Sequence, residues 1–132
     1  MVLAEQEPLI VTGTVESNIL FGLEKDTDWY KEVCWACCLD LDFSTMPSGD
    51  QTKLGEMGHN LSGGQKSRIS LARAIYRHNA SIILIDGTLS SLDAKIAKLV
   101  MERAVLGLCA DKCVVFVTQI LTMQLRWTQS ST

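Results

Sequence analysis

The chain has 132 residues, of which 47% are hydrophobic and only 2 are proline, as is usual for one globular domain and unusual for a disordered or fibrous protein. Its net charge of -3 argues against nucleic acid as a partner, since binding to a phosphate backbone needs clustered lysine and arginine. Its apolar runs fall far short of the roughly 18 residues of a membrane span, and residues 1–8 lack a secretory signal pattern, so the sequence predicts a cytoplasmic protein that reaches a membrane only through a partner.

The first predicted elements are short, and a helix follows them. Residues 9–12 are expected to be extended, Gly13 to make a turn, and residues 18–21 to form a short apolar piece. Asp26 and Asp28 are N-cap candidates for a helix that reaches about residue 39. The buried stripe of this amphipathic helix is predicted to consist of Tyr30, Val33, Cys34, Cys37 and Cys38.

The five cysteines are an odd number, which leaves at least one thiol unpaired in any disulfide scheme, so free thiols are the simpler interpretation. Cys34 and Cys37 make a C-x-x-C motif, but the other close pair, Cys109 and Cys113, has a wider gap and lies far along the chain. This spacing is poor for a metal site. We therefore expect buried structural thiols, with a zinc or redox site as the open alternative.

A polar segment precedes the next helix. Residues 46–60 contain Pro47 and several glycines, which is the composition of an ordered loop with special backbone positions. Ser62 then opens a helix to about residue 76, in which the apolar residues from Ile69 onward keep a helical period.

The second half of the chain alternates strand, helix and strand. Residues 81–86 form an apolar run that ends in a carboxylate, which is typical of a strand buried on both faces and central in a parallel sheet. After a turn at 87–91, residues 92–109 are predicted to be helical and residues 113–118 to form another buried strand. This order of elements favours a right-handed β-α-β unit. The residues from 121 to the end have no clear hydrophobic period.

Two features in this frame carry chemistry. Ser62, Gly63 and Gly64 at a helix start combine a hydroxyl cap, two unhindered amide donors and the positive end of a helix dipole, which suits a phosphate group. Asp86 closes a strand at the sheet edge where ligands of open α/β folds collect, and its carboxylate suits magnesium. Taken singly, the Ser-Gly-Gly segment is equally a helix cap without a ligand, and Asp86 is equally a cap or turn residue. Only the two features together are specific for a nucleotide-binding site.

The sequence LSGGQKSRISLARAIY at 61–76, followed by SIILIDGTLSSLD at 81–93, resembles the signature motif, Walker B strand and D-loop of ABC ATPases. Upstream, QEPLIVTGTVESNILFG at 6–22 resembles the Q-loop region of exporters, and MPSGDQTKLGEMGHNLSGGQ at 46–65 resembles the C subfamily, the multidrug-resistance-associated type. The resemblance covers about residues 5–125. It implies an α/β fold, a partial P-loop NTPase-like ABC ATPase domain. The helical and signature subdomain would lie at about 14–76. A parallel-sheet remnant with the Walker B strand, the D-loop and the switch strand would lie at about 77–125, followed by a tail at 126–132.

The resemblance also implies roles for single residues. Ser62, Gly63 and Gly64 would contact the γ-phosphate of an ATP held by a second nucleotide-binding domain in a head-to-tail dimer, and Gln65 completes that loop. Gln6 corresponds to the Q-loop glutamine, which senses Mg²⁺ and the attacking water and couples to the transmembrane domains of a transporter at the cytoplasmic face of its membrane. Asp86 corresponds to the magnesium ligand. Asp93 corresponds to the D-loop aspartate.

The sequence departs from the family pattern in three places. It lacks the P-loop pattern G-x-x-x-x-G-K-[ST], which the family carries before the Q-loop, so we expect a domain truncated before that point that binds ATP weakly or only with a partner. Gly87 occupies the place of the acidic residue after the Walker B aspartate, and glycine cannot act as a general base. Gln119 occupies the place of the switch histidine and cannot take its positive charge.

We therefore expect a region of an exporter ATPase that does not hydrolyse ATP by itself. Its remaining sheet is expected to have an exposed edge and an uncovered apolar face. Two alternatives stay open: a non-catalytic partner that supplies the signature loop to another subunit's ATP site, and a truncated product with no independent role. ABC proteins of DNA repair and translation share the signature. The exporter-like segment at 13–22 and the net negative charge of the chain disfavour this class of protein.

Overall fold

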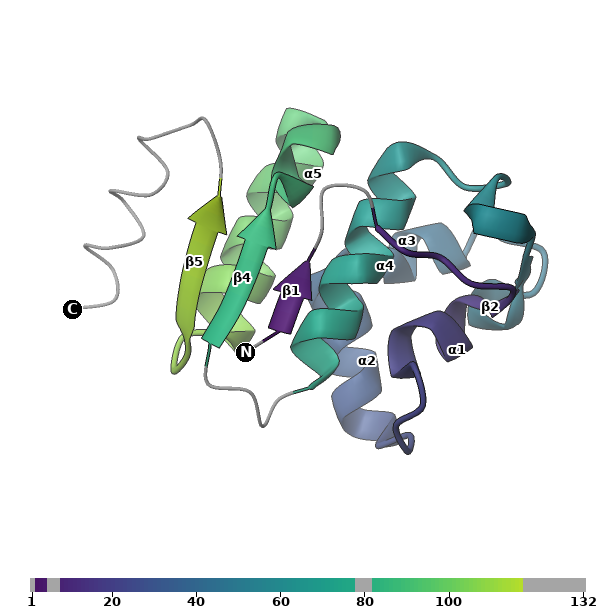
Figure 1. The fold of residues 1–132 in the computed structure, drawn as a ribbon, viewed down its shortest axis with the longest axis horizontal. Coiled ribbons are helices and arrows are strands. Elements are labelled where there is room, and N and C mark those ends of the chain that lie inside the picture. The colour runs from purple at the N-terminus through teal and green to yellow at the C-terminus, as the bar shows by residue number, and fades with distance from the viewer. Residues whose placement is uncertain (1, 5–7, 78–81, 118–132) are drawn as a thin grey trace.

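A computed structural model describes residues 2–4, 8–77 and 82–117 of the chain. In this part, a small sheet stands beside a group of helices (Figure 1). β4 lies at the centre of the sheet, between β1 and β5, and both of its pairings are parallel. The three strands are β1 (Val2–Ala4), β4 (Ile82–Asp86) and β5 (Cys113–Val117).

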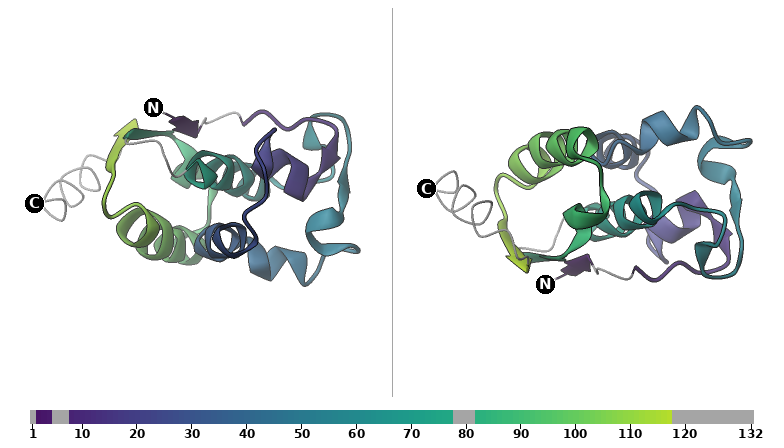
Figure 2. Two further views of the ribbon diagram at one scale, coloured as in Figure 1. Left: turned by 90° about the horizontal axis from the view of Figure 1, so that it is seen from below. Right: turned by 90° about the horizontal axis from the view of Figure 1, so that it is seen from above.

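The connection from β4 to β5 is helical, as predicted. A short 3-10 turn, η3 (Thr88–Ser91), leads into α5 (Ala94–Val100), and the helix continues as the π-helical η4 (Met101–Leu108). The π-helical part was not predicted; its wider turn closes with the bond from Cys109 N to Ala104 O at 2.9 Å. Figure 2 shows the helices on one face of the sheet. Ile83 and Ile85 of β4 and Val114 of β5 are buried.

The helical part is organised around one long helix. α4 (Gly63–Tyr76) packs against three shorter helices and against β1, and it begins after Ser62 as predicted. Its buried apolar residues, from Ile69 to Ile75, form the centre of the hydrophobic core. The three surrounding helices are α1 (Val15–Leu20), α2 (Thr27–Ala36) and α3 (Leu39–Phe43).

The structure corrects the expectations for the first segment. The predicted turn at Gly13 is instead a strand, β2 (Gly13–Thr14), which pairs antiparallel with β3 (Lys53–Leu54). Residues 18–21, expected as a short apolar piece, belong mostly to α1, which begins earlier because Thr14 and Ser17 form a reciprocal cap. Buried Asn18 joins this helix to the preceding segment, since its side chain accepts from Val11 N at 2.9 Å and donates to Val11 O at 3.0 Å.

The helix after Asp26 is also shorter than expected. Asp26 is its N-cap, as predicted, but α2 ends at Ala36 rather than near residue 39. Cys38 takes a left-handed conformation with φ 59°, which breaks the helix and starts α3 in a new direction. The carbonyl of Cys38 accepts a hydrogen bond from Arg68 on α4 at 3.0 Å, so contacts from another helix stabilise the break.

The segment 46–60 is largely irregular, as its composition predicts. It contains two single turns of 3-10 helix, η1 (Gly49–Gln51) and η2 (Glu56–Gly58), with β3 between them. Gly58 has φ 66°, a conformation that side-chain-bearing residues rarely adopt.

The predicted burial of Tyr30, Val33, Cys34, Cys37 and Cys38 is confirmed. Their place on one helix is not, because Cys37 and Cys38 lie beyond the end of α2. The cysteines are free thiols, and burial raises the pKa of Cys34 to about 12. Among the described residues, no group of three or more histidine, cysteine or acidic side chains is placed to hold a metal ion. In the same residues, no helix has the length and apolar character needed to cross a membrane.

Candidate functional site

The start of α4 is closed by a reciprocal cap. The Ser62 hydroxyl accepts from Gln65 N at 3.1 Å, and the Gln65 side-chain oxygen accepts from Ser62 N at 2.9 Å. This is a capping box, with glutamine at the third helical position. We name Ser62, Gly63, Gly64 and Gln65 the cap loop; each was a predicted site residue.

The cap loop leaves two backbone donors free. The first amides of a helix have no carbonyl one turn earlier to bind, and here Lys66 N binds Ser62 O at 3.0 Å while Gln65 N binds the Ser62 hydroxyl. Within the described residues, the amides of Gly63 and Gly64 have no protein acceptor. Gly63 is exposed, and a Cβ there would meet nothing within 4 Å. Two free amides at the positive end of a 14-residue helix form a site suited to an anion.

The cap loop lies beside the turn that precedes α5. A Cβ at Gly64 would lie 3.4 Å from Leu92 Cδ2 and 3.4 Å from Ser91 O, so the two backbones approach closely. Asp93 follows this turn as the N-cap of α5, and its carboxylate accepts from Ile96 N at 2.9 Å. The structure therefore brings Asp93 into the neighbourhood of the cap loop and gives it a capping bond; its role toward a ligand stays a prediction.

The remaining predicted residues are placed only in part. Asp86 is the last residue of β4, where its backbone pairs with Val117, as predicted for a strand-end aspartate. Gly87 follows with φ 65° and starts the η3 turn, with its carbonyl accepting from Ser90 N at 3.1 Å. Gln6 and Gln119 lie outside the described residues, so their roles stay predictions.

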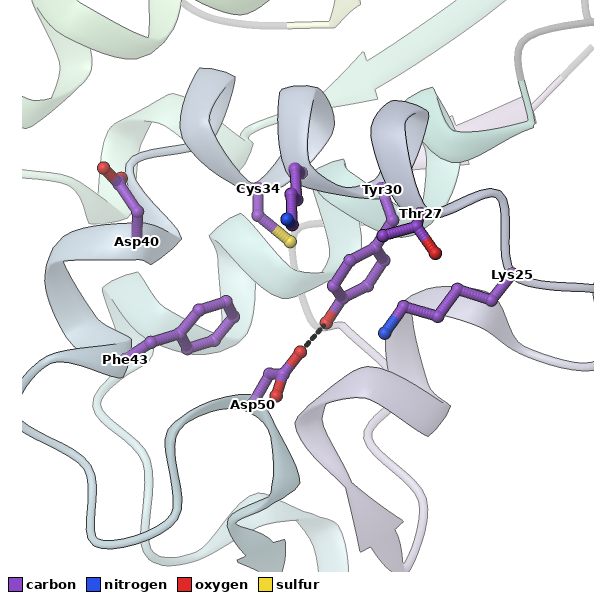
Figure 3. Close-up of a pocket in the computed structure, with 8 residues that line it drawn as sticks. Lys25, Thr27, Tyr30, Cys34, Asp40, Phe43 and Asp50 are labelled. Atoms are coloured by element: carbon purple, nitrogen blue, oxygen red, sulfur yellow. Dashed lines mark hydrogen bonds between the residues drawn. The ribbon is translucent and has the colours of Figure 1, made fainter.

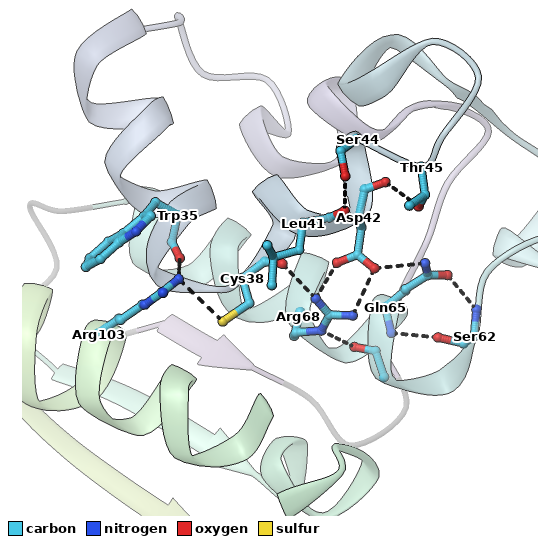
Figure 4. Close-up of polar contacts among 11 residues, drawn as sticks. Trp35, Cys38, Leu41, Asp42, Ser44, Thr45, Ser62, Gln65, Arg68 and Arg103 are labelled. Carbon is cyan, nitrogen blue, oxygen red and sulfur yellow. Dashed lines mark hydrogen bonds and ion pairs between the residues drawn. The ribbon is translucent and has the colours of Figure 1, made fainter. Parts of the chain in front are cut away.

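Behind the cap loop lies a polar network that the sequence reasoning missed (Figure 4). Asp42 on α3 forms an ion pair with Arg68 on α4, and its Oδ1 also accepts from Gln65 Nε2 at 3.1 Å. Arg68 further donates to Gly64 O at 3.3 Å, and only 7% of this residue is exposed. The network ties the cap loop to α3. Arg68 is a charged residue within the apolar period of this helix, but that position alone does not identify Asp42 as its partner.

A hollow of about 240 Å³ opens on the helical part (Figure 3). On its wall, the Tyr30 hydroxyl donates to Asp50 Oδ2 at 2.9 Å, and burial raises the pKa of this tyrosine. Lys25 lies 4.9 Å from the centre of the Tyr30 ring and pairs with Glu16 at 2.8 Å. No predicted site residue lines this hollow, so it is separate from the cap loop; its lining is Lys25, Thr27, Tyr30, Lys31, Cys34, Asp40, Phe43 and Asp50.

Comparison with known proteins gives the chain its relatives. No family model matches the sequence. The ATP-binding cassette transporter abc2 of Schizosaccharomyces pombe is 44% identical over 122 residues, which are 91% of this chain and 8% of the relative. The human ATP-binding cassette sub-family C member 10 is 48% identical over 106 residues, or 80% of this chain and 7% of the relative. A probable multidrug resistance-associated protein of Drosophila melanogaster is 48% identical over 113 residues, or 86% of this chain and 8% of the relative.

The chain thus spans less than a tenth of the length of each of these relatives. The matches cover most of the chain, and all three relatives belong to one group of transporters. The resemblance of the cap loop and of the strand ending at Asp86 to ABC motifs agrees with them. The chain belongs to the C family of ATP-binding cassette transporters, as a short part of its members' length.

Proposed function

We propose that the chain acts as part of the ATP-binding region of an ABC exporter, in which the cap loop contacts the γ-phosphate of an ATP held by a second nucleotide-binding domain. The observation that carries this proposal is the pair of free amides at Gly63 and Gly64, at the positive end of α4. Ser62 supplies a hydroxyl beside them. All three groups suit the same negatively charged ligand.

The charges around the cap loop agree with an anionic ligand. The acidic side chain bound to the loop is Asp42, and its charge is paired with Arg68 on the inner side. Lys66 follows the loop on α4 and adds a positive charge. A phosphate would therefore approach without an unpaired carboxylate of the loop opposing it.

The same groups are too few for strong binding by this chain alone. A hydrogen bond to a charged group contributes about 1.5–3 kcal/mol, and association itself costs several kcal/mol in lost freedom. Two amides and one hydroxyl leave little net affinity for ATP. The site is thus a half-site, completed by a domain that holds the remaining phosphates and their Mg²⁺. Asp93 lies at the dimer contact, and Asp86 and Gln6 are the residues of this chain that would hold Mg²⁺ at the other ATP site of the dimer.

A non-catalytic role within that dimer is favoured by one further residue. Gly87 follows the strand-end aspartate and has no side chain that could take a proton from water. The chain by itself therefore does not hydrolyse ATP. Its contribution to transport is to bind nucleotide together with its partner domain and to pass the resulting closure to transmembrane domains.

Calorimetry of ATP binding with Mg²⁺ tests this function. The titration compares the chain alone, an intact C-family nucleotide-binding domain whose own signature serine is replaced by alanine, and a mixture of the two. We expect tighter binding in the mixture than in either protein alone. Ser62→Ala removes the gain, and the exposed Ser48→Ala, which is outside the cap loop, keeps it. An affinity of the intact domain that does not change when the chain is added would rule the proposal out.

A further inference from the structure

The side-chain amide of Gln65 is held in one orientation from two sides. Its oxygen accepts from Ser62 N at 2.9 Å, and its NH₂ group donates to Asp42 Oδ1 at 3.1 Å. A half-turn of the amide would exchange oxygen and nitrogen. Because a carboxylate can only accept and a backbone N–H can only donate, both neighbours select the same orientation.

Asp42 is itself fixed by the opposite helix. Its Oδ2 accepts from Arg68 Nη1, and its Oδ1 accepts from Arg68 Nη2 at 3.3 Å as well as from Gln65. Arg68 Nη1 also binds the carbonyl of Cys38, at the point where the chain turns into α3. The side chains of Arg68 and Asp42 are only 9% and 15% exposed. Both carboxylate oxygens are therefore engaged by donors in a nearly closed environment.

We propose that Asp42 is a positioning residue for the cap loop: held by Arg68, it orients the Gln65 amide so that Ser62 is fixed and the amides of Gly63 and Gly64 keep their outward direction. It acts through Gln65, since its own contacts are with Gln65 and Arg68 rather than with the two free amides. The effect on ATP rests on the function proposed above. The effect on the loop is a property of the chain alone.

The physical reason is that donors fixed in advance bind an anion better than mobile ones. Without a carboxylate at position 42, the Gln65 amide loses the neighbour that keeps its NH₂ group away from Ser62. If the Gln65 amide turns, its NH₂ group faces the backbone N–H of Ser62. Both groups are donors, so the reciprocal cap opens. The backbone of Gly63 and Gly64 then samples several directions.

Asp42→Asn is the sharpest variant because it keeps the size of the side chain. Both oxygens of Asp42 accept hydrogen bonds, so the new NH₂ group must face a donor, either of Gln65 or of Arg68. Asp40→Asn is the matched control, since Asp40 lies on the same helix, undergoes the same chemical change, and is exposed and outside the network. Asp42→Glu restores a carboxylate and serves as the rescue variant.

The first measurement is made on the chain alone, by ¹⁵N–¹H NMR and amide hydrogen exchange. In Asp42→Asn we expect the amide signals of Ser62 through Gln65 to move and the exchange of the Ser62 amide to speed up by about tenfold, the size of one lost hydrogen bond. Asp42→Glu brings the signals part of the way back, and Asp40→Asn leaves them in place. Unchanged Ser62 and Gly63 signals in a folded Asp42→Asn chain would overturn the positioning role.

The second measurement repeats the ATP titration of the mixture. We expect Asp42→Asn to weaken ATP binding by about tenfold, Asp42→Glu to recover part of this, and Asp40→Asn to have no effect. If the wild-type chain gives no gain in ATP affinity while the NMR changes occur, the proposed function fails and the positioning role stands. If the wild-type chain gives the gain and Asp42→Asn gives it equally, the positioning role fails.

Gln65→Met covers the case in which Asp42→Asn does not fold. This variant keeps the ion pair between Asp42 and Arg68 and removes only the amide that connects it to Ser62. We expect the Ser62 amide to lose its protection from exchange to the same extent. Full protection of Ser62 in Gln65→Met would overturn the inference.

Discussion

The hydroxyl of Ser67 lies 2.6 Å from the hydroxyl of Ser91, and this contact joins the helix of the cap loop to the turn before Asp93. Ser67 is buried one turn into α4, and Ser91 ends η3. The start of α4 and the η3 turn, which adjoin the predicted ligand residues, are therefore joined to each other by a hydrogen bond as well as packed on the core.

This contact predicts a modest loss of stability when it is broken. Ser67→Ala removes one hydroxyl of the pair, and we expect the free energy of unfolding to fall by about 1 kcal/mol in urea denaturation. The double variant with Ser91→Ala should lose less than the sum of the single losses, because both changes remove the same bond. Ser48→Ala, at an exposed serine, is the control. Strict additivity of the two single variants would contradict a direct bond between them.

The buried thiol of Cys34 predicts a fall in stability at high pH. Burial raises its pKa from 9.0 to about 12, so the folded chain keeps this proton while the unfolded chain loses it. The stability that the thiol contributes is complete below pH 9 and is lost as the pH rises toward 12. Cys34→Ala should therefore flatten the pH dependence of the unfolding free energy as the pH rises from 9 toward 12, by up to about 1.4 kcal/mol per pH unit.

The control for the thiol prediction is Cys113→Ala, since Cys113 is exposed. Both variants are unfolded in urea with a reducing agent present. Equal slopes against pH for Cys34→Ala and for the wild-type chain would show that the Cys34 proton is not held by the fold.

The backbone conformation and close packing of Gly58 predict that alanine is poorly tolerated at this position. Its φ is 66°, and a Cβ there would lie 2.9 Å from Ile10 Cγ2, which is itself buried. We expect Gly58→Ala to lower the free energy of unfolding by about 2 kcal/mol, from backbone strain and the contact together. Thermal and urea unfolding measure this loss. A stability equal to that of the wild-type chain would mean that the loop at 55–58 rearranges freely.

The free space around Gly63 predicts a variant that loses ATP binding without losing stability. A Cβ at this position meets nothing within 4 Å, so Gly63→Ala should leave the melting temperature unchanged. The new methyl group stands beside the two free amides and hinders an approaching phosphate. We expect about tenfold weaker ATP binding in the mixture with the partner domain, or about 1.4 kcal/mol. Undiminished binding by this variant would argue against phosphate contact at Gly63.

The elements with strong local signals could be predicted from the sequence. Serine followed by two glycines and a glutamine before an apolar period gave the start of α4 at Ser62, and an apolar run ending in a carboxylate gave the end of β4 at Asp86. Asp26 was recognised as a helix cap for the same reason. In each case the residues that decide the structure are close together in the chain.

The missed features depend on contacts between distant residues. The break at Cys38 has no glycine or proline to mark it; instead Arg68 from α4 binds its carbonyl and Arg103 from η4 approaches its sulfur at 3.8 Å. Asp42 had no apparent role in the sequence because its partners lie more than twenty residues further along the chain. Tertiary contacts of this kind override local preference, so neither the short α3 nor the network behind the cap loop could be predicted.

The parallel pairing of β1 with β4 also sets the order in which the chain can fold. Val2 pairs with Ile83, so most of the chain must close as a loop before this contact forms, and the entropy of that closure grows with loop length. β4 and β5 are much nearer neighbours in sequence and are joined by a helix that forms locally. During synthesis β1 is made well before β4, so the pairing of these two strands waits until β4 has been made. We therefore expect the pairing of β1 with β4 to form after that of β4 with β5.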